Sequence, residues 1–130
     1  TVWDALAGFP GIGTLLPLML SEGVNKNKIT ISQLVNLTSM NAAKIFGMYP
    51  TKGSLELNSD ADITLIDLKK EQKVTSDLFG GFSDYIVYDG WKLKGWPVKT
   101  IVRGQTVAED FQVIGKPGYG KLVSRKTNST

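Results

Sequence analysis

Residues 98–108, VKTIVRGQTVA, decide the fold class of this 130-residue chain. Two runs rich in β-branched residues flank the dipeptide Arg103-Gly104. Glycine readily adopts the positive φ that a tight hairpin turn requires. The segment therefore predicts an antiparallel β-hairpin.

Further strands are predicted on both sides of this hairpin, because alternating or β-branched runs lie between turn residues. The candidates are residues 54–57, 63–66, 72–75 and 112–114. Residues 76–97 combine several glycines and Pro97 with a series of aromatic residues. This mixture predicts a long loop whose aromatic side chains lie on a neighbouring surface.

Residues 14–47 are expected to form three short helices. Thr14 is placed to cap the first helix, with Pro17 in its first turn and Gly23 at its end. The side chains expected to face the core are Leu16, Met19 and Leu20.

The second helix is predicted to begin at a capping box, Thr30-Ile31-Ser32-Gln33. Asn41 is expected to cap the third helix, and Gly47 to end it in a left-handed conformation. The apolar residues expected on the buried faces are Leu34, Val35, Leu37, Ala42, Ala43, Ile45 and Phe46.

The chain contains no histidine and no cysteine. The chain therefore cannot form a serine–histidine catalytic pair, a thiolate or imidazole metal site, or a disulfide from its own residues. The formal charge of +3 comes from scattered lysines and arginines, which is typical of a solvated surface rather than a nucleic-acid interface. The longest apolar run is too short to span a membrane. The lack of cysteine fits a reducing compartment, and we expect a cytoplasmic protein.

Three acidic residues, Asp60, Asp62 and Asp67, form the densest carboxylate group. Carboxylates alone suit Mg²⁺ or Ca²⁺, but the spacing does not match an EF-hand loop. Aspartates at the entry to a strand are typical turn formers that accept backbone hydrogen bonds. We expect a structural role for this group.

The stretch GFPGIGTLLPLML, residues 8–20, places glycines and prolines against apolar residues. It lacks the Gly-Lys-Ser/Thr sequence and the preceding strand of a phosphate-binding loop. A tight turn that opens a helix can pack against a core, or it can present main-chain groups to a small ligand. The residues alone leave both possibilities open.

Several motifs occur in order along the chain: GFPGIGTLLPLML at 8–20, TSMNAAKIFG at 38–47, SDAD at 59–62, GWKLKGWPVKTIVRG at 90–104 and GKPGYG at 115–120. Together they resemble the C-terminal third of the cyclic amidohydrolases, which include dihydroorotases, allantoinases, hydantoinases and dihydropyrimidinases. The segment SDYIVYDG at 83–90 and the extension at 115–125 most resemble the hydantoinase and dihydropyrimidinase branch.

This resemblance implies an α+β chain that holds the C-terminal helices of a TIM barrel followed by the C-terminal strands of a small β-sandwich. Residues 1–48 would be the last loop and helices of the barrel, residues 49–115 the sandwich portion, and residues 116–130 a C-terminal tail. The missing N-terminal part of the same enzyme is then an expected partner. A homo-oligomer is also expected, since family members often form dimers or tetramers.

The resemblance further implies metal-dependent hydrolysis of a small cyclic amide, most closely a hydantoin or dihydropyrimidine. The family's ligands are histidines, a carboxylated lysine and an aspartate, which would all precede Thr1. Two zinc or other divalent ions are therefore expected in the full-length enzyme and none on this chain, which should be inactive alone. Neither nucleic acid nor a membrane is expected as a partner.

Only Ala7 and Gly8 match a functional position of the family, a backbone segment that touches the substrate ring in some members. No catalytic or metal-binding residue is assigned within this chain. The alternatives are a dihydroorotase or allantoinase, a non-catalytic homologue that acts as a scaffold, and an independent β-rich binding module.

Overall fold

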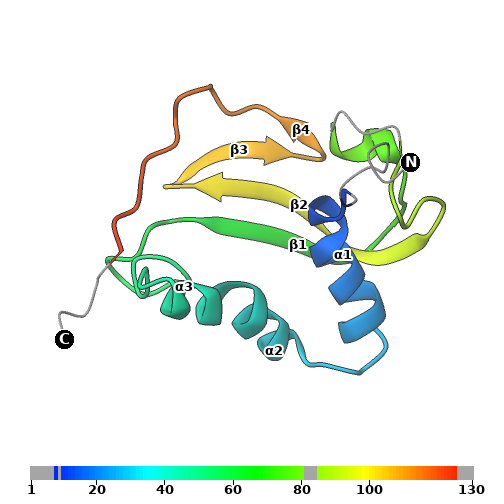
Figure 1. The fold of residues 1–130 in the computed structure, drawn as a ribbon, viewed down its shortest axis with the longest axis horizontal. Helices are drawn as coiled ribbons and strands as arrows, with labels where there is room; N and C mark the ends of the chain where they lie inside the picture. The colour runs from blue at the N-terminus through cyan, green and yellow to red at the C-terminus, as the bar shows by residue number, and fades with distance from the viewer. Residues whose placement is uncertain (1–7, 9, 81–84, 126–130) are drawn as a thin grey trace, which may run out of the picture.

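A computed structural model describes residues 8, 10–80 and 85–125, in which helices precede a four-stranded antiparallel sheet. The strands lie in the order β1-β2-β3-β4. Their bounds are β1 Ile63–Lys73, β2 Lys92–Val102, β3 Gln105–Glu109 and β4 Gln112–Val113. Figure 1 shows α1 crossing the sheet near one end of β2, while α2 and α3 follow the β1 edge. The predicted α+β class is confirmed.

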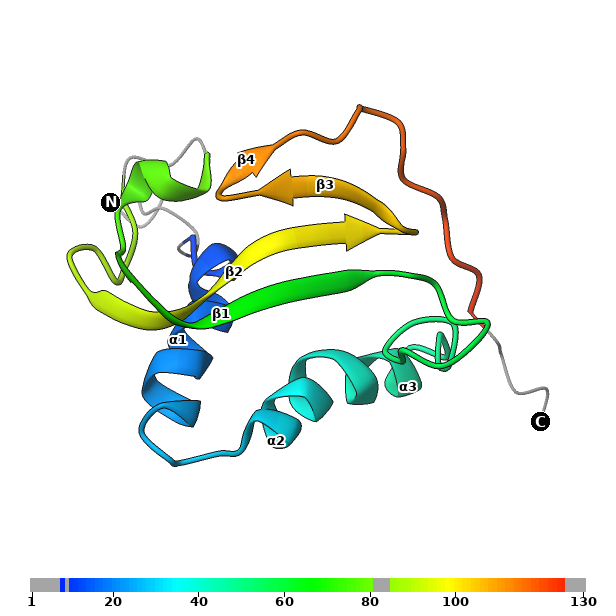
Figure 2. The same cartoon turned by 180° about the vertical axis from the view of Figure 1, so that it is seen from behind.

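The predicted hairpin is confirmed as β2 and β3. Val102 pairs with Gln105, so Arg103 and Gly104 form a two-residue turn. Their φ angles are 45° and 80°, as a type I′ turn requires. The strand predicted at 112–114 is confirmed as the short β4, and Figure 2 shows these outer strands from behind.

The other strand predictions are partly wrong. Residues 63–66 and 72–73 belong to one long strand, β1. Residues 54–57 form no strand, and their alternating Leu55 and Leu57 are 79% and 95% exposed. Alternation indicates a strand only where a neighbouring strand and a core cover one face, and this segment has neither.

The expected long loop at 76–97 is also shorter than predicted. It contains a 3₁₀ turn, η5 (Ser76–Phe79), and β2 begins at Lys92. Gly95 and Pro97 therefore lie inside a strand. The pairing register shifts between Leu65 and Ile66, opposite Pro97, and such a β-bulge accommodates a residue that cannot donate to the ladder.

The first helical segment combines a 3₁₀ turn, η2 (Ile12–Thr14), α1 (Leu15–Leu18) and a π-helical end, η3 (Met19–Val24). Thr14 does not cap it, because its hydroxyl donates to the Gly11 carbonyl at 2.9 Å from inside the helix. Gly23 lies within η3 rather than at the end. The predicted core side is confirmed, since Leu20 is fully buried and its apolar neighbours are half-buried.

The second helical segment begins at the predicted capping box. The Gln33 N–H donates to Thr30 Oγ1 at 3.1 Å, and the Thr30 N–H donates to Gln33 Oε1 at 2.8 Å. From there α2 (Ile31–Val35), the π-helical η4 (Asn36–Met40) and α3 (Asn41–Ile45) follow without interruption. The separate third helix and its Asn41 cap are therefore wrong, because Met40 is already helical. Gly47 ends the segment with φ of 67°, as predicted.

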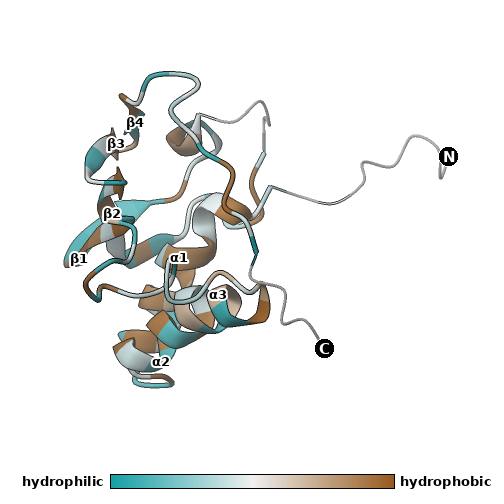
Figure 3. Cartoon of the chain, turned by 90° about the vertical axis from the view of Figure 1, so that its left-hand side faces the viewer, coloured by the Kyte–Doolittle hydropathy of each residue, from teal (hydrophilic) through white to brown (hydrophobic). Residues whose placement is uncertain are grey.

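Fewer apolar side chains of this segment are buried than predicted. Leu34 and Ala43 are buried, but Val35, Leu37, Ile45 and Phe46 are about half or more exposed. Figure 3 views the sheet along its strands, and the helices gather on one side of it with brown, apolar residues at several places on their surfaces.

The core is centred on Trp96 in β2, which is fully buried together with Leu93 and Val74. The Trp96 ring stacks on Phe79 at 6.3 Å and meets Phe111 edge-on at 5.5 Å. Its indole N–H donates to the Leu93 carbonyl at 2.8 Å, so no buried donor is left unpaired there. The expectation that aromatic residues of 76–97 pack on a neighbouring surface is confirmed for Phe79 and Trp96.

Gly95 joins the first helix to this core. Its φ is 94°, and a β-carbon there would lie 2.8 Å from Leu20 Cβ. Nearby, Asn25 Nδ2 donates to the carbonyls of Leu20 and Lys94 at 3.1 and 2.9 Å. The end of the first helical segment therefore packs directly against the backbone of β2.

We expect Gly95→Ala to lower the free energy of unfolding by about 2–5 kcal/mol, because it adds both backbone strain and a clash with Leu20. Gly104→Ala is the matched control: its φ is 80° and it has open space around the β-carbon position. The control should lose only about 1–2 kcal/mol, from strain alone. Denaturant unfolding of both variants measures the difference, and equal losses would contradict the close approach of helix and strand.

Candidate functional site

The candidate site is the turn that precedes α1, of which the structure describes residues 8 and 10–14. Gly8, its one sequence-predicted site residue within the described part of the chain, is exposed and has φ of 83°. A β-carbon at Gly8 would meet no atom within 4 Å. The Gly8 carbonyl accepts a hydrogen bond from the Tyr85 hydroxyl at 3.1 Å. Ala7, the other predicted site residue, lies outside the described residues.

The end of this turn is packed against the core. Thr14 is fully buried, and both its N–H and its hydroxyl donate to the Gly11 carbonyl. A β-carbon at Gly13 would lie 2.7 Å from the Phe79 ring, so glycine is needed for this close contact. The turn therefore has two parts: Gly13 and Thr14 pack against the core, while the backbone at Gly8 is open to solvent.

Tyr85 is the contact that sequence reasoning missed. From the sequence it is only one of several aromatic residues in an expected loop. Its hydrogen bond to Gly8 joins positions 77 residues apart, and no local pattern reports such a pairing. The aromatic content of the loop was the only available signal.

The predicted structural role of the acidic group is confirmed. Lys52 Nζ forms ion pairs with the carboxylates of Asp60, at 2.7 Å, and Asp62. Asp62 Oδ1 also accepts the Arg103 N–H at 2.8 Å, at the turn between β2 and β3. Asp67 Oδ1 accepts the backbone N–H groups of the two residues that follow Leu68, as a turn-forming aspartate does.

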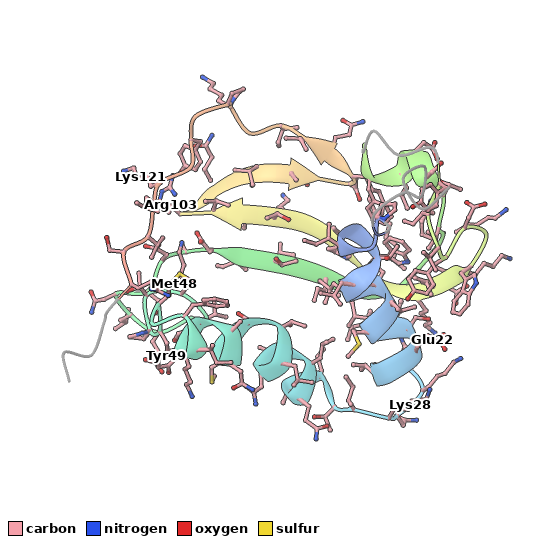
Figure 4. The ribbon with its side chains drawn as sticks, viewed as in Figure 1. Glu22, Lys28, Met48, Tyr49, Arg103 and Lys121 are labelled. Atoms are coloured by element: carbon pink, nitrogen blue, oxygen red, sulfur yellow. The ribbon has the colours of Figure 1, made fainter. Side chains whose placement is uncertain are left out.

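These contacts hold one end of the sheet together. The Arg103 guanidinium donates to the Tyr119 carbonyl and lies 4.4 Å from the centre of the Tyr119 ring. The Tyr119 hydroxyl in turn donates to the Val102 carbonyl at 3.2 Å. Figure 4 shows Arg103 beside the C-terminal segment near Lys121, at the end of the sheet opposite Glu22 and Lys28.

Electrostatics support this arrangement. Burial alone would raise the pKa of Asp62, but the Lys52 ammonium and the Arg103 N–H outweigh it and lower that pKa below its usual value. Burial likewise opposes the charge on Lys52, yet Asp60 and Asp62 together raise the pKa of Lys52. Lys52 and Asp62 therefore each stabilise the charged form of the other.

The carboxylates in the described part of the chain do not group into a catalytic metal centre. Within the described residues, no group of three or more aspartates or glutamates is placed to hold an ion. The nearest approach to such a group, Asp60 with Asp62, is already neutralised by Lys52. In the described part of the chain, no helix is both long and apolar enough to cross a bilayer.

Residues 12–107 match the amidohydrolase family, and the chain belongs to that family. Over 125 residues it is 42% identical to the L-hydantoinase of Paenarthrobacter aurescens, covering 96% of this chain and 27% of that protein. It is 39% identical to the dihydroorotase of Pyrococcus furiosus, covering 92% of this chain and 28% of that protein. The solved structure of the L-hydantoinase from Arthrobacter aurescens superposes with a TM-score of 0.89 over 95% of this chain and 28% of that one.

The resemblance to cyclic amidohydrolases drawn from the motifs is therefore confirmed, and hydantoinases rank above dihydroorotase among the matches. The chain spans about a quarter of the length of these relatives.

The pH dependence of stability tests the Lys52 cluster. Because the folded pKa of Asp62 is lowered, its contribution is present above about pH 4, the usual pKa of an aspartate, and is lost as the pH falls through the folded value. Asp62→Asn should lower stability by about 1 kcal/mol at pH 7 and lose less than the wild type on acidification to pH 3. Urea unfolding at both pH values measures this.

Two variants control this experiment. Lys52→Met should flatten the acid response in the same way, because it removes the charge that Asp62 pairs with. Asp110→Asn removes an exposed partner of Lys70 and should change stability at pH 7 by less than about 0.5 kcal/mol. An unchanged acid response in both Asp62→Asn and Lys52→Met would contradict the proposed role of the cluster.

Proposed function

We propose that this chain is the C-terminal part of a metal-dependent cyclic-amide hydrolase of the hydantoinase or dihydropyrimidinase type. The observation that carries the proposal is the superposition on L-hydantoinase, at 42% identity over 95% of the chain. The reaction adds water to a ring amide carbon, breaks the carbon–nitrogen bond and transfers a proton to the leaving nitrogen. This chain contributes substrate orientation and not the hydrolytic centre.

The division of labour follows from the residues present. We propose that two divalent ions, zinc in the simplest case, are held by residues outside this chain, because the carboxylates of its described residues do not group into a metal centre. Ala7 and Gly8 are proposed to present main-chain groups to the substrate ring. Gly8 supports this role because its backbone is exposed and carries no side chain that would keep a planar ring away.

The placement of the segments within the whole enzyme is also proposed. Residues 1–48 would complete a TIM barrel, residues 49–115 would contribute to a β-sandwich, and residues 116–130 would form the tail. We further propose a cytoplasmic homo-oligomer. The end of the helices at Ile45 and the start of the strands at Ile63 support a boundary between the first two segments.

Exposed apolar side chains support the view that more polypeptide covers this chain. On the helices and at the residue after α3, the exposed large apolar residues are Ile12, Leu15, Ile31, Val35, Leu37, Ile45 and Phe46. Many exposed apolar residues on a small chain typically mark an interface. Since relatives are about four times longer, we propose that the remainder of the same polypeptide covers them.

The full-length protein should open the ring of a 5-substituted hydantoin or of dihydrouracil. We expect kcat/KM to be at least about tenfold higher for these rings than for dihydroorotate, a difference near 1.4 kcal/mol in transition-state binding. A chelator should abolish turnover by the full-length protein and leave the thermal unfolding of the 130-residue chain unchanged.

The same assay separates the alternatives. A preference for dihydroorotate, which the 39% identity to a dihydroorotase favours as the second candidate, would reassign the substrate. No ring opening of hydantoin, dihydrouracil, dihydroorotate or allantoin by the metal-loaded protein would favour the non-catalytic homologue.

The 130-residue chain expressed alone should self-associate and bind a hydrophobic dye such as ANS, whereas the full-length protein should bind little dye. Light scattering and dye fluorescence measure both properties. A monomer that unfolds cooperatively and binds no dye would instead indicate an independent module.

A further inference from the structure

The hydrogen bond between Tyr85 and Gly8 connects the candidate substrate turn to the segment between β1 and β2. The Tyr85 hydroxyl donates to the Gly8 carbonyl at 3.1 Å. The contact is long-range in sequence, so it forms only when the tertiary structure is complete.

The Tyr85 side of this contact is held firmly. The next residue, Ile86, is buried in the same core cluster as Val74 and Trp96. The segment is closed by backbone hydrogen bonds, from the Val74 N–H to the Trp91 carbonyl at 2.8 Å and from the Gly90 N–H to the Val74 carbonyl at 2.9 Å. The tyrosine hydroxyl therefore projects from an anchored backbone.

Among the described residues, none packs on the Gly8 side in a comparable way. Glycine rotates freely about φ, and no atom lies within 4 Å of the position where its β-carbon would be. A peptide unit is planar, so a hydrogen bond that holds its oxygen also fixes the orientation of the whole unit. At this position the Tyr85 hydroxyl supplies an orientation that side-chain packing does not.

We propose that Tyr85 is a positioning residue for substrate binding. Its hydroxyl sets the direction of the Gly8 peptide unit, so that main-chain groups of this turn meet the cyclic amide without reorganisation. Tyr85 does not touch the reacting atoms. This inference rests on the proposed function, in which the Gly8 turn contacts the substrate ring.

The experiment compares Tyr85→Phe with Tyr119→Phe in the full-length protein. Both substitutions remove one tyrosine hydroxyl that donates to a backbone carbonyl, at 3.1 Å in the first case and 3.2 Å in the second. Tyr119 contacts Arg103 at the turn that follows β2, whereas Tyr85 belongs to the segment that precedes β2. Because each variant loses one such hydrogen bond, a difference between their kinetic constants comes from where the lost bond lies in the structure.

Tyr85→Phe should raise KM for a 5-substituted hydantoin by about two- to tenfold, which is the effect of one hydrogen bond, and change kcat by less than about twofold. The turn contacts the ring equally in the ground and transition states, so its misorientation weakens uniform binding. Tyr119→Phe should leave both constants within about twofold of the wild type. Equal KM values for the two variants would overturn the proposal.

A second measurement reads the turn without catalysis. Hydrogen–deuterium exchange of the peptide that contains residues 8–14 should become several-fold faster in Tyr85→Phe and stay unchanged in Tyr119→Phe. Unchanged exchange in Tyr85→Phe would show that the hydroxyl does not orient the turn. If the wild type opens no cyclic amide but this exchange still increases, the proposed function fails while the orienting role of Tyr85 stands.

A double-mutant cycle with Gly8→Ala shows whether Tyr85 acts through Gly8. Alanine at φ of 83° forces the turn to rearrange and should itself raise KM. Adding Tyr85→Phe to this variant should then have little further effect, since residues that act through one element are not additive. Fully additive effects would show that Tyr85 acts by another route, and the positioning role would be wrong.

Discussion

The packing around Gly95 and Trp96 in the middle of β2 is the constraint on which the other contacts depend. Because Gly95 has no side chain, Leu20 of the first helical segment packs directly against the backbone of β2. Trp96 fills the core beside it. Phe79, from the segment after β1, and Phe111, from the turn after β3, both pack on the Trp96 ring. Helix, sheet and connecting segment therefore share one contact region, and none of them can move without disturbing the others.

The candidate site inherits its geometry from this region. Phe79, stacked on Trp96, lies against Gly13 and so fixes where the turn enters α1. Ile86, in the same cluster, fixes the backbone from which Tyr85 reaches Gly8. The turn is thus held at both of its ends by the segment between β1 and β2, although neither contact lies near it in the sequence.

Local sequence patterns predicted the features that depend on neighbouring residues. The Arg103-Gly104 turn and the capping box of Thr30 and Gln33 need only a few adjacent residues, and both were predicted correctly. Glycine and proline usually end strands, so the sequence of residues 92–97 predicts a loop. In the structure these residues belong to β2, because a bulge lies opposite Pro97 and Gly95 meets Leu20 closely. The alternating pattern at 54–57 predicts a strand that does not form, because none of the described strands pairs with this segment.

The candidate site also shows that sequence patterns miss contacts between residues that are far apart in the chain. Gly8 could be singled out because a motif of the family includes it, but Tyr85 could not, because only folding brings a residue 77 positions away onto its carbonyl. The chain has no histidine and no cysteine, and its described residues contain no unpaired carboxylate cluster, so under the proposed function it would act by fixing the direction of main-chain groups that meet the substrate. For such a contribution the relevant residues are those that hold a peptide plane still, and these are found from contacts rather than from chemically reactive side chains.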